Sequence, residues 1–320
     1  MSFKGYSTSI RGASHDDSGK PCQDASISIV HDDYAVAVVS DGHGGSRYYR
    51  SEVGSKLAVQ ASIDVITSCM GEGRSDFITG LESDPSKVLK RVTDAVLTRW
   101  TDLVMQYDIE NPPSEEELSL EDSDGEREAL RAYGATLICG VLSDDVVFGF
   151  QIGDGELVAV NDESEESMLM PEDPDCFLNR TSSICSSEAS SKFRHFFVCE
   201  SVNDIESDDL CAVCADPCKV SSISVCTDGL STSFNSDESF MRYCSAIPAV
   251  LASGDVKRLE DNLLLRSRSN TRDDVSLSVV YRPVEVTVGL AAARHNSKVR
   301  STQKSRKNRL KRKDRRCGRR

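Results

Sequence analysis

The sequence predicts an α+β fold whose sheet is mostly antiparallel. Runs rich in β-branched and aromatic residues follow one another closely, with only short turns between them, which is typical of antiparallel hairpins. Segments with apolar residues at every third or fourth position, typical of amphipathic helices, lie between and after these runs. The 320 residues contain no internal repeat of the kind that marks solenoid proteins.

The first part of the chain is predicted to contain two strands followed by two helices. Residues 1–40 are predicted to form a strand, a turn-rich loop around Pro21, and then a strongly apolar strand, YAVAVVS, which ends before Asp41. Over residues 46–69 the apolar positions recur in steps of three and four, which indicates an amphipathic helix. The same spacing predicts a second helix over residues 85–107.

The second half of the chain returns to β-rich runs and ends with helices and one more strand. Two helices are predicted over residues 236–251 and 255–266. The predicted strands are GATLICGVL (134–142), DVVFGFQIG (145–153), ELVAV (156–160), FRHFFVCE (193–200), SISVCTD (222–228) and DVSLSVVYR (274–282).

Two segments are too acidic to fit this pattern. Residues 108–128 contain ten acids, two prolines and one base, and residues 161–175 contain seven acids and no base. Because such compositions bury little apolar surface, both segments are predicted to be flexible acidic insertions.

The net charge of −14 hides an uneven distribution. Residues 294–320 hold 14 of the 38 Lys and Arg and one of the 52 acids, which leaves 24 bases and 51 acids in residues 1–293. The acidic body repels nucleic acid, so only the tail is suited to bind it. We expect the tail, residues 286–320, to be disordered and its basic part, 294–320, to contact either an external polyanion or the acidic body itself.

Membrane and secretion signals are absent from the sequence. No apolar stretch is long enough to span a membrane, and the polar N-terminus lacks the apolar core of a signal peptide, so we expect a cytoplasmic protein. Cys211, Cys214 and Cys218 have a spacing compatible with zinc or an iron–sulfur cluster if Cys199 or Cys226 completes the set. Ordinary thiols in a loop are the favoured interpretation.

Aspartates stand where several predicted strands begin or end. Asp41, Asp154 and Asp228 each close a strand and precede a glycine, and Asp273 and Asp274 precede the last strand. Carboxylates gathered from strand ends favour Mg²⁺ or Mn²⁺. A single Asp-Gly pair equally indicates a turn. The run DGHGG, which follows a buried strand, has more glycines than a tight turn requires and therefore indicates a functional site.

Taken together, four blocks in order resemble the metal-dependent protein Ser/Thr phosphatases, the PPM or type 2C family, in its bacterial branch. The blocks are GASH (12–15) with GKPCQD (19–24), VSDGHGG (39–45), YGAT (133–136) with IGD (152–154), and CTDGL (226–230) with RDDVS (272–276). The resemblance implies a four-layer α-β-β-α sandwich of two packed antiparallel sheets flanked by helices. It implies a phosphatase domain over residues 1–285, to which the acidic insertions and the tail have no counterpart.

The resemblance also implies roles for particular residues. Asp41 would bridge two Mn²⁺ or Mg²⁺ ions, with the Gly42 carbonyl on one of them and Asp228 and Asp273 on the other. Asp24 would lie at the metal cluster, and Asp154 would hold a third ion together with Asp228. His43 would protonate the leaving oxygen of phosphoserine or phosphothreonine, which is general acid catalysis. Two divalent cations close together activate a bridging water for in-line attack on phosphorus.

Two positions depart from the family pattern. Where the family usually has an arginine that grips the substrate phosphate, this chain has Gly19, and Lys20, His15 or Arg11 are the candidates to replace it. A lysine lacks the bidentate fork of arginine. Gln23 stands where many members have an acid. The expected function is metal-dependent hydrolysis of phosphoserine and phosphothreonine on proteins.

Two alternatives remain open at this point. One is a catalytically weak or inactive family member that binds phosphoproteins as a regulator. The other is an adaptor whose basic tail binds nucleic acid or a membrane surface, with the body as a scaffold.

Overall fold

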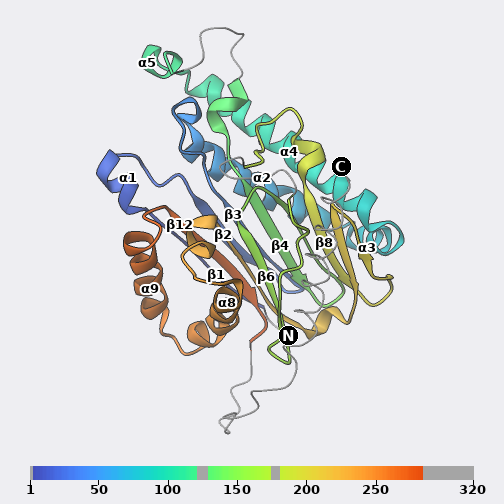
Figure 1. Cartoon of the computed structure of the whole chain (residues 1–320). Helices are drawn as coiled ribbons and strands as arrows, with labels where there is room; N and C mark the ends of the chain where they lie inside the picture. Colours follow the sequence, from blue (N-terminus) through green and yellow to red (C-terminus); the bar gives the residue numbers. More distant parts are fainter. Residues whose placement is uncertain (1–2, 121–128, 174–180, 284–320) are drawn as a thin grey trace, which may run out of the picture. The chain divides into compact units, whose positions relative to one another are not determined.

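Two mostly antiparallel sheets, flanked by helices on their outer faces, form the core of the computed structural model, which describes residues 3–120, 129–173 and 181–283 (Figure 1). One sheet has the strand order β1-β12-β11-β6-β7, and the other has the order β2-β3-β4-β5-β8-β10-β9. Among the described strands, only β8 and β10 pair in parallel. The predicted fold class, α+β with a four-layer sandwich, is confirmed.

The strands and helices are spread along the whole described chain. The strands are β1 (Lys4–Ile10), β2 (Ala25–Val30), β3 (Tyr34–Ser40), β4 (Leu137–Ser143), β5 (Val147–Ile152), β6 (Glu156–Asn161), β7 (Glu166–Ser167), β8 (Arg194–Cys199), β9 (Ile205–Glu206), β10 (Leu210–Cys214), β11 (Val220–Cys226) and β12 (Val275–Tyr281). The helices are α1 (Ala13–Ser18), α2 (Ser51–Cys69), α3 (Arg74–Ser83), α4 (Pro85–Glu110), α5 (Glu115–Leu118), α6 (Ala189–Lys192), α7 (Asp228–Ser231), α8 (Asp237–Ala252) and α9 (Val256–Ser269), with short 3-10 turns η1 (Ser46–Tyr48), η2 (Ala129–Tyr133) and η3 (Pro217–Lys219).

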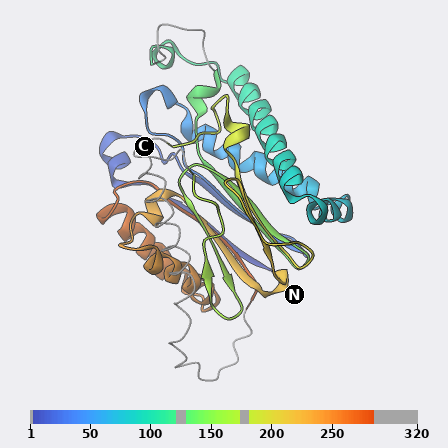
Figure 2. The same cartoon turned by 45° about the vertical axis from the view of Figure 1, so that its right-hand side comes forward.

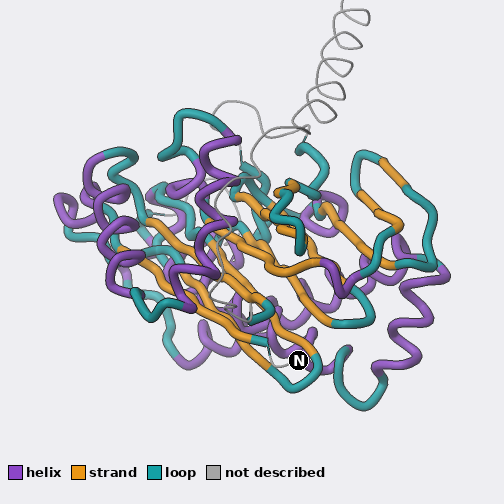
Figure 3. The backbone as a smooth tube through the Cα atoms, turned by 90° about the horizontal axis from the view of Figure 1, so that it is seen from below, coloured by secondary structure: helices purple, strands orange, loops and turns teal. Residues whose placement is uncertain are grey.

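Each sheet is covered by its own helices. Helices α2, α3 and α4 lie on the outer face of the seven-stranded sheet, and α8 and α9 lie on the outer face of the five-stranded sheet (Figures 1 and 2). Seen from below, the strands occupy the middle of the molecule and the helices lie outside them (Figure 3). None of the described helices has both the length and the apolar character that a membrane crossing requires.

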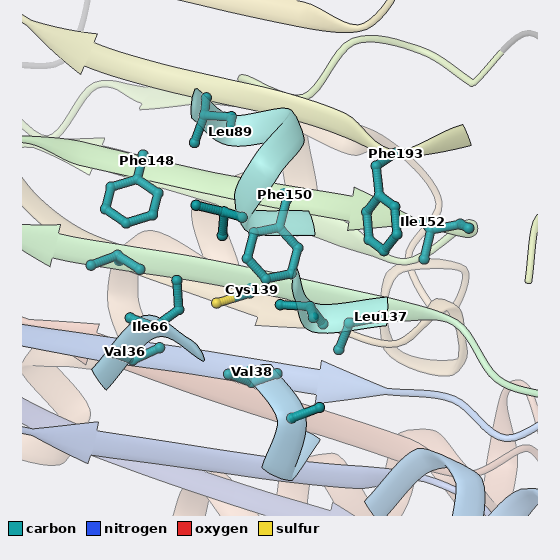
Figure 4. Close-up of a cluster of buried hydrophobic side chains, with 14 of the residues drawn as sticks. Val36, Val38, Ile66, Leu89, Leu137, Cys139, Phe148, Phe150, Ile152 and Phe193 are labelled. Atoms are coloured by element: carbon teal, nitrogen blue, oxygen red, sulfur yellow. The ribbon is translucent and has the colours of Figure 1, made fainter. Parts of the chain in front are cut away.

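The burial of β3 explains why its sequence is apolar without interruption from Tyr34 to Val39. Val36 and Val38 face the helices, whereas Ala35, Ala37 and Val39 face the other sheet. A strand that is buried on both faces needs apolar residues in succession rather than in alternation. Figure 4 shows the core between the seven-stranded sheet and its helices, in which aromatic and aliphatic side chains such as Phe148 and Phe150 are packed.

Most predicted elements are present, and the differences concern short ones. The helix predicted from residue 46 begins at Ser51, after the 3-10 turn η1, and the helix predicted over 85–107 continues to Glu110. The sequence patterns did not predict α1, β2 or α3, nor the edge strand β9 and its neighbour β10. Short edge elements carry weak periodicity, so the pattern of apolar residues does not identify them.

The acidic segments differ from the prediction of flexible insertions. Residues 108–119 are ordered, because they form the end of α4 and the helix α5. Part of the second segment forms the short strand β7, which pairs with β6. Residues 121–128 and 174–175 of the two segments, and the predicted basic tail, lie outside the described residues.

Candidate active site

Four aspartates from different strand ends meet at one cavity. Asp41 follows β3, Asp154 follows β5, Asp228 begins α7 after β11, and Asp273 precedes β12. The cavity has a volume of about 170 Å³. The residues that line it are His15, Gln23, Asp41, Gly42, His43, Gly44, Thr136, Asp154, Thr181, Asp228 and Asp273.

The turn after β3 is fixed by a reciprocal pair of hydrogen bonds. Thr136 donates its backbone N–H to the Asp41 carbonyl at 2.8 Å, and its hydroxyl accepts the Asp41 N–H at 3.0 Å. A Cβ at Gly42 would lie 2.6 Å from the Gln23 carbonyl oxygen and 2.7 Å from that of Ser51. Because no side chain fits between these backbones, position 42 requires glycine.

His43 is held by its backbone from three sides. Its N–H donates to the Gly134 carbonyl at 3.1 Å, and its own carbonyl accepts from Gln23 Nε2 at 3.2 Å and Ser51 Oγ at 2.9 Å. Its ring packs edge-on against Tyr48, with the ring centroids 4.8 Å apart. Burial lowers the pKa of His43 to about 4, and the charge of Asp154 opposes this effect.

The carboxylates crowd one another. Burial and the negative charges of Asp24 and Asp228 raise the pKa of Asp41 well above its ordinary value. Burial and the charge of Asp154 raise the pKa of Asp228 to about 6. Neither lysine nor arginine is among the described residues that line the cavity. Hard cations with oxygen ligands would relieve this repulsion, so the donor set fits divalent metal ions in residue type and charge.

The side chains do not form a ready-made metal cage. Within the described ranges, no three His, Cys, Asp or Glu side chains are grouped so as to hold a metal ion. Asp41 and Asp228 are nevertheless in direct side-chain contact, and the raised pKa of each reflects burial among carboxylates. The fit to a metal therefore rests on the kind of ligands that converge and on their charge.

Asp24 lies behind the cavity, where it is 4% exposed and does not belong to the lining. Its Oδ2 accepts a hydrogen bond from Thr227 Oγ1 at 2.8 Å. Burial and the charge of Asp274 raise its pKa well above the ordinary value. Asp24 is thus enclosed by protein behind the lining, where its charge acts on Asp41.

Asp154 sits on a tight turn that its neighbours support. Thr181 donates its hydroxyl to Asp154 Oδ2 at 2.5 Å. Gln151 Nε2 donates to the carbonyls of Gly153 and Gly155, at 3.1 and 2.5 Å. The turn therefore has a defined geometry, as a ligand position requires.

The candidates for phosphate binding differ in their position. His15 lines the cavity, and its Nδ1 lies 2.9 Å from Asp274 Oδ2. Lys20 does not line the cavity, and its Nζ donates to the Gly44 carbonyl at 2.6 Å. Arg11 donates to the His15 carbonyl at 2.8 Å and lies 3.4 Å from Asp16. Both basic side chains thus contact the backbone of residues that line the cavity.

The sequence analysis missed Asp274 as a site residue. Its carboxylate is 4% exposed and binds the backbone of Gly12 and Gln23. The feature of the sequence that could have indicated this role is the pair of aspartates before β12. Two successive residues entering a strand point to opposite faces, so the two carboxylates are directed to different surroundings.

The cysteine cluster considered for a metal is not assembled. Cys211 and Cys214 belong to β10 rather than to a loop, and their spacing of three residues places them on opposite faces of the strand. Cys199 lies in β8 of one sheet and Cys226 in β11 of the other. The described cysteines are free thiols, and no three of them lie close enough together to hold a metal ion.

Comparisons with known proteins agree with this arrangement. The family model described as protein phosphatase 2C matches residues 11–264. A bacterial serine phosphatase structure is 13% identical, with a TM-score of 0.50 over 87% of this chain and 97% of that chain. The catalytic domain of the serine/threonine protein phosphatase PstP, in complex with two manganese ions, is 16% identical, with a TM-score of 0.50 over 88% and 98%.

A third solved structure shares the same fold. A sex-determining protein of C. elegans is 14% identical, with a TM-score of 0.52 over 88% of this chain and 66% of that chain. Among curated proteins, no sequence match is found. At these identities the structural neighbours establish the fold, and the family model establishes the family. The chain therefore belongs to the protein phosphatase 2C family of metal-dependent protein serine/threonine phosphatases.

Proposed function

We propose that this protein hydrolyses phosphoserine and phosphothreonine on proteins, with Mn²⁺ or Mg²⁺ as its cofactor. The observation that carries the proposal is one cavity in which Asp41, Asp154, Asp228 and Asp273 converge beside His43. The acceptor-rich lining suits divalent cations, which would in turn neutralise the charge of a phosphate monoester. PstP, which has the same fold, holds two manganese ions in its structure.

In this proposal the chain's own residues hold two ions. Asp41 would be the ligand shared by both, the Gly42 carbonyl would hold one, and Asp228 and Asp273 would hold the other. Asp24 supports the cluster from behind. When bound, such ions supply a water with a lowered pKa and neutralise the charge of the phosphoryl oxygens. Asp154 and Asp228 hold a third ion in the same proposal.

His43 is the proposed proton donor to the leaving serine or threonine oxygen. Burial favours the neutral imidazole. A phosphate dianion beside the ring would raise its pKa and favour the imidazolium, because an opposite charge stabilises the charged form. His15 and Lys20 are the proposed contacts to the substrate phosphate, through His15 directly and through Lys20 after it leaves the Gly44 carbonyl.

One observation favours the alternative, a weak or inactive member that binds phosphoproteins as a regulator. No arginine is among the described residues that line the cavity, so the bidentate phosphate contact is missing there. A phosphatase and a regulator would both bind a phosphoprotein, but only the phosphatase would hydrolyse it at an appreciable rate.

The other assignments are proposals as well. We propose a phosphatase domain over residues 1–285, with acidic insertions at 108–128 and 161–175, and a separate basic tail over residues 286–320. The tail, through residues 294–320, contacts a polyanion or the acidic body. A cytoplasmic location is supported by the ten described cysteines, all of which are free thiols.

A phosphatase assay of the full chain tests the proposal. The purified protein is given phosphoserine and phosphothreonine peptides with Mn²⁺, with Mg²⁺, or with EDTA. We expect turnover only with metal, and a loss of more than about a thousandfold in Asp41→Asn, because the nucleophilic water depends on both ions. A metal-loaded protein that binds phosphopeptides without hydrolysing them would support the regulator instead.

A further inference from the structure

One buried arginine holds the acidic segment after α4 in place. Arg50, which precedes α2, is 8% exposed. Its Nε and Nη2 donate to the two carboxylate oxygens of Glu117 in α5, at 2.8 and 3.1 Å. Its Nη1 donates to the Asn111 carbonyl at 2.7 Å. The segment from Asn111 to Glu117 is therefore fixed to the start of α2 by a bidentate ion pair and a backbone contact.

The same guanidinium reaches the segment that precedes β4. Arg50 Nη1 donates to Tyr133 Oη at 2.8 Å, and this hydroxyl donates to Asp108 Oδ1 at 2.9 Å. The backbone N–H of Arg50 donates to the Ala132 carbonyl at 3.0 Å. A Cβ at Gly54, on α2, would lie 1.9 Å from the Tyr133 carbonyl oxygen, so Tyr133 and α2 are in direct backbone contact. The position of Tyr133 thus depends on Arg50.

Tyr133 is one residue away from the support of His43. The next residue, Gly134, accepts the hydrogen bond from the His43 N–H at 3.1 Å. Gly134 also lies against the ring of Tyr48, which packs edge-on against His43. A displacement of Tyr133 would therefore reach His43 through its backbone and through its ring contact.

Glu117 is the residue that keeps this network together. Besides binding Arg50, its Oε2 accepts the Ser114 N–H at 2.8 Å, and its own N–H donates to Ser114 Oγ at 3.2 Å, which closes a capping box at the start of α5. The hydrogen bond from Arg50 is the main reason that the pKa of Glu117 is lowered to about 2. Without Glu117 the buried guanidinium would lose its bidentate partner.

We propose that Arg50 and Glu117 are positioning residues for His43, so that the acidic segment is part of the active-site support rather than a separate appendage. The proposal rests on the proposed function, because it concerns proton donation by His43 in that reaction. It adds a role for residues that lie outside the cavity lining.

Two small substrates test the proposal without any effect of peptide docking. Phenolate leaves phosphorus less readily than nitrophenolate, so phenyl phosphate depends more on a well-placed acid than p-nitrophenyl phosphate does. With the full chain and Mn²⁺, Glu117→Ala should lower kcat about tenfold or more for phenyl phosphate and less than about threefold for p-nitrophenyl phosphate. Arg50→Lys keeps the positive charge but loses the bidentate geometry of the guanidinium. It should therefore give the same difference between the two substrates.

Glu116→Ala is the matched control, because Glu116 is an exposed acid one position earlier in the same helix. It should leave both rates unchanged. Equal losses on both substrates in Glu117→Ala, or equal behaviour of Glu117→Ala and Glu116→Ala, would overturn the proposal. If Arg50→Lys does not fold, Glu117→Ala decides alone.

A second measurement does not require turnover. Amide hydrogen exchange of the metal-free protein should be faster at the His43 N–H in Glu117→Ala than in Glu116→Ala, because the bond to Gly134 is weakened. Unchanged exchange at His43 would overturn the proposal. If the unaltered protein hydrolyses neither substrate while the exchange difference is present, the proposed function fails and the structural coupling stands.

Discussion

The carboxylate of Asp274 joins His15 to the backbone that carries Gln23. Its Oδ2 lies 2.9 Å from His15 Nδ1 and accepts the Gln23 N–H at 2.6 Å, while Oδ1 accepts the Gly12 N–H at 2.6 Å. Residues separated by about 250 positions along the chain are thereby held at one side of the cavity. A single buried carboxylate thus orients His15, which among the candidates for phosphate binding in the described part of the chain is the one that lines the cavity.

Asp274→Asn should therefore destabilise the protein. The amide nitrogen of asparagine would face one of the two backbone N–H groups, and that buried donor would lose its acceptor. We expect a loss of about 1–3 kcal/mol in the free energy of unfolding, measured by urea denaturation. The control is Asp273→Asn at the neighbouring exposed position, which should stay within about 0.5 kcal/mol. Equal stability of the two variants would contradict the role given to Asp274.

His43→Ala should slow phosphopeptides more than p-nitrophenyl phosphate. A serine alkoxide requires a proton to leave, whereas nitrophenolate leaves without one. Since general acid catalysis contributes about 10²–10⁴-fold, the difference between the two substrates should approach that size. Steady-state kinetics with saturating Mn²⁺ measure it. Equal losses on both substrates would indicate that His43 has a purely structural role.

Because His195 is buried, it should make the folded protein less stable at acidic pH. It is 3% exposed, and burial lowers its pKa to about 4 from the ordinary 6.5, with the Asp209 carbonyl 3.3 Å from Nδ1 and Thr93 Oγ1 3.4 Å from Nε2. Between these two values the unfolded chain binds the extra proton, so stability falls as the pH drops from 6.5 toward 4, by at most about 3 kcal/mol.

The comparison of His195→Gln with the unaltered protein isolates this effect, because the buried aspartates of the active site titrate in both. The free energy of unfolding is measured by urea denaturation at several pH values. The difference between the two proteins should change across that pH range. A constant difference would show that His195 does not titrate in this way.

Removal of residues 294–320 should change activity only at low salt. The tail carries 14 basic residues and one acid and contains few apolar residues, so its contacts are electrostatic. Above about 0.5 M salt, screening reaches contact distances and the truncated and full-length proteins should behave alike. The measurement is turnover across a salt series, with and without an added polyanion. Identical behaviour at low salt would mean that the tail has no part in the reaction.

The sequence predicted the elements whose pattern is local. The apolar run of β3 is continuous because both of its faces are buried, and DGHGG is rich in glycine because the backbones of Gln23 and Ser51 approach Gly42 closely. The regular spacing in α2 and α4 likewise follows from one buried face. Such constraints act on successive residues and can therefore be recognised in the sequence.

The acidic segment shows the opposite case. Its composition predicts no order, since it buries little apolar surface, yet residues 108–110 end α4 and residues 115–118 form α5. The cause is Arg50, 58 positions before Asp108 and 67 before Glu117, whose buried charge requires acidic partners. Neither composition nor periodicity contains that information.

Local patterns in the sequence therefore determined the α+β class and the aspartates at strand ends beside DGHGG, because strands, turns and ligand types follow from neighbouring residues, while the four-layer sandwich was implied by the resemblance of the four blocks to the phosphatase family. Only the tertiary structure decided that Asp274 holds His15 and Gln23, that Lys20 contacts Gly44, and that Arg50 joins the acidic helix to the support of His43. These are contacts between residues distant in the chain. Burial and charge in the folded protein determine which polar groups become partners. The order of residues along the chain does not show which polar groups will be buried together.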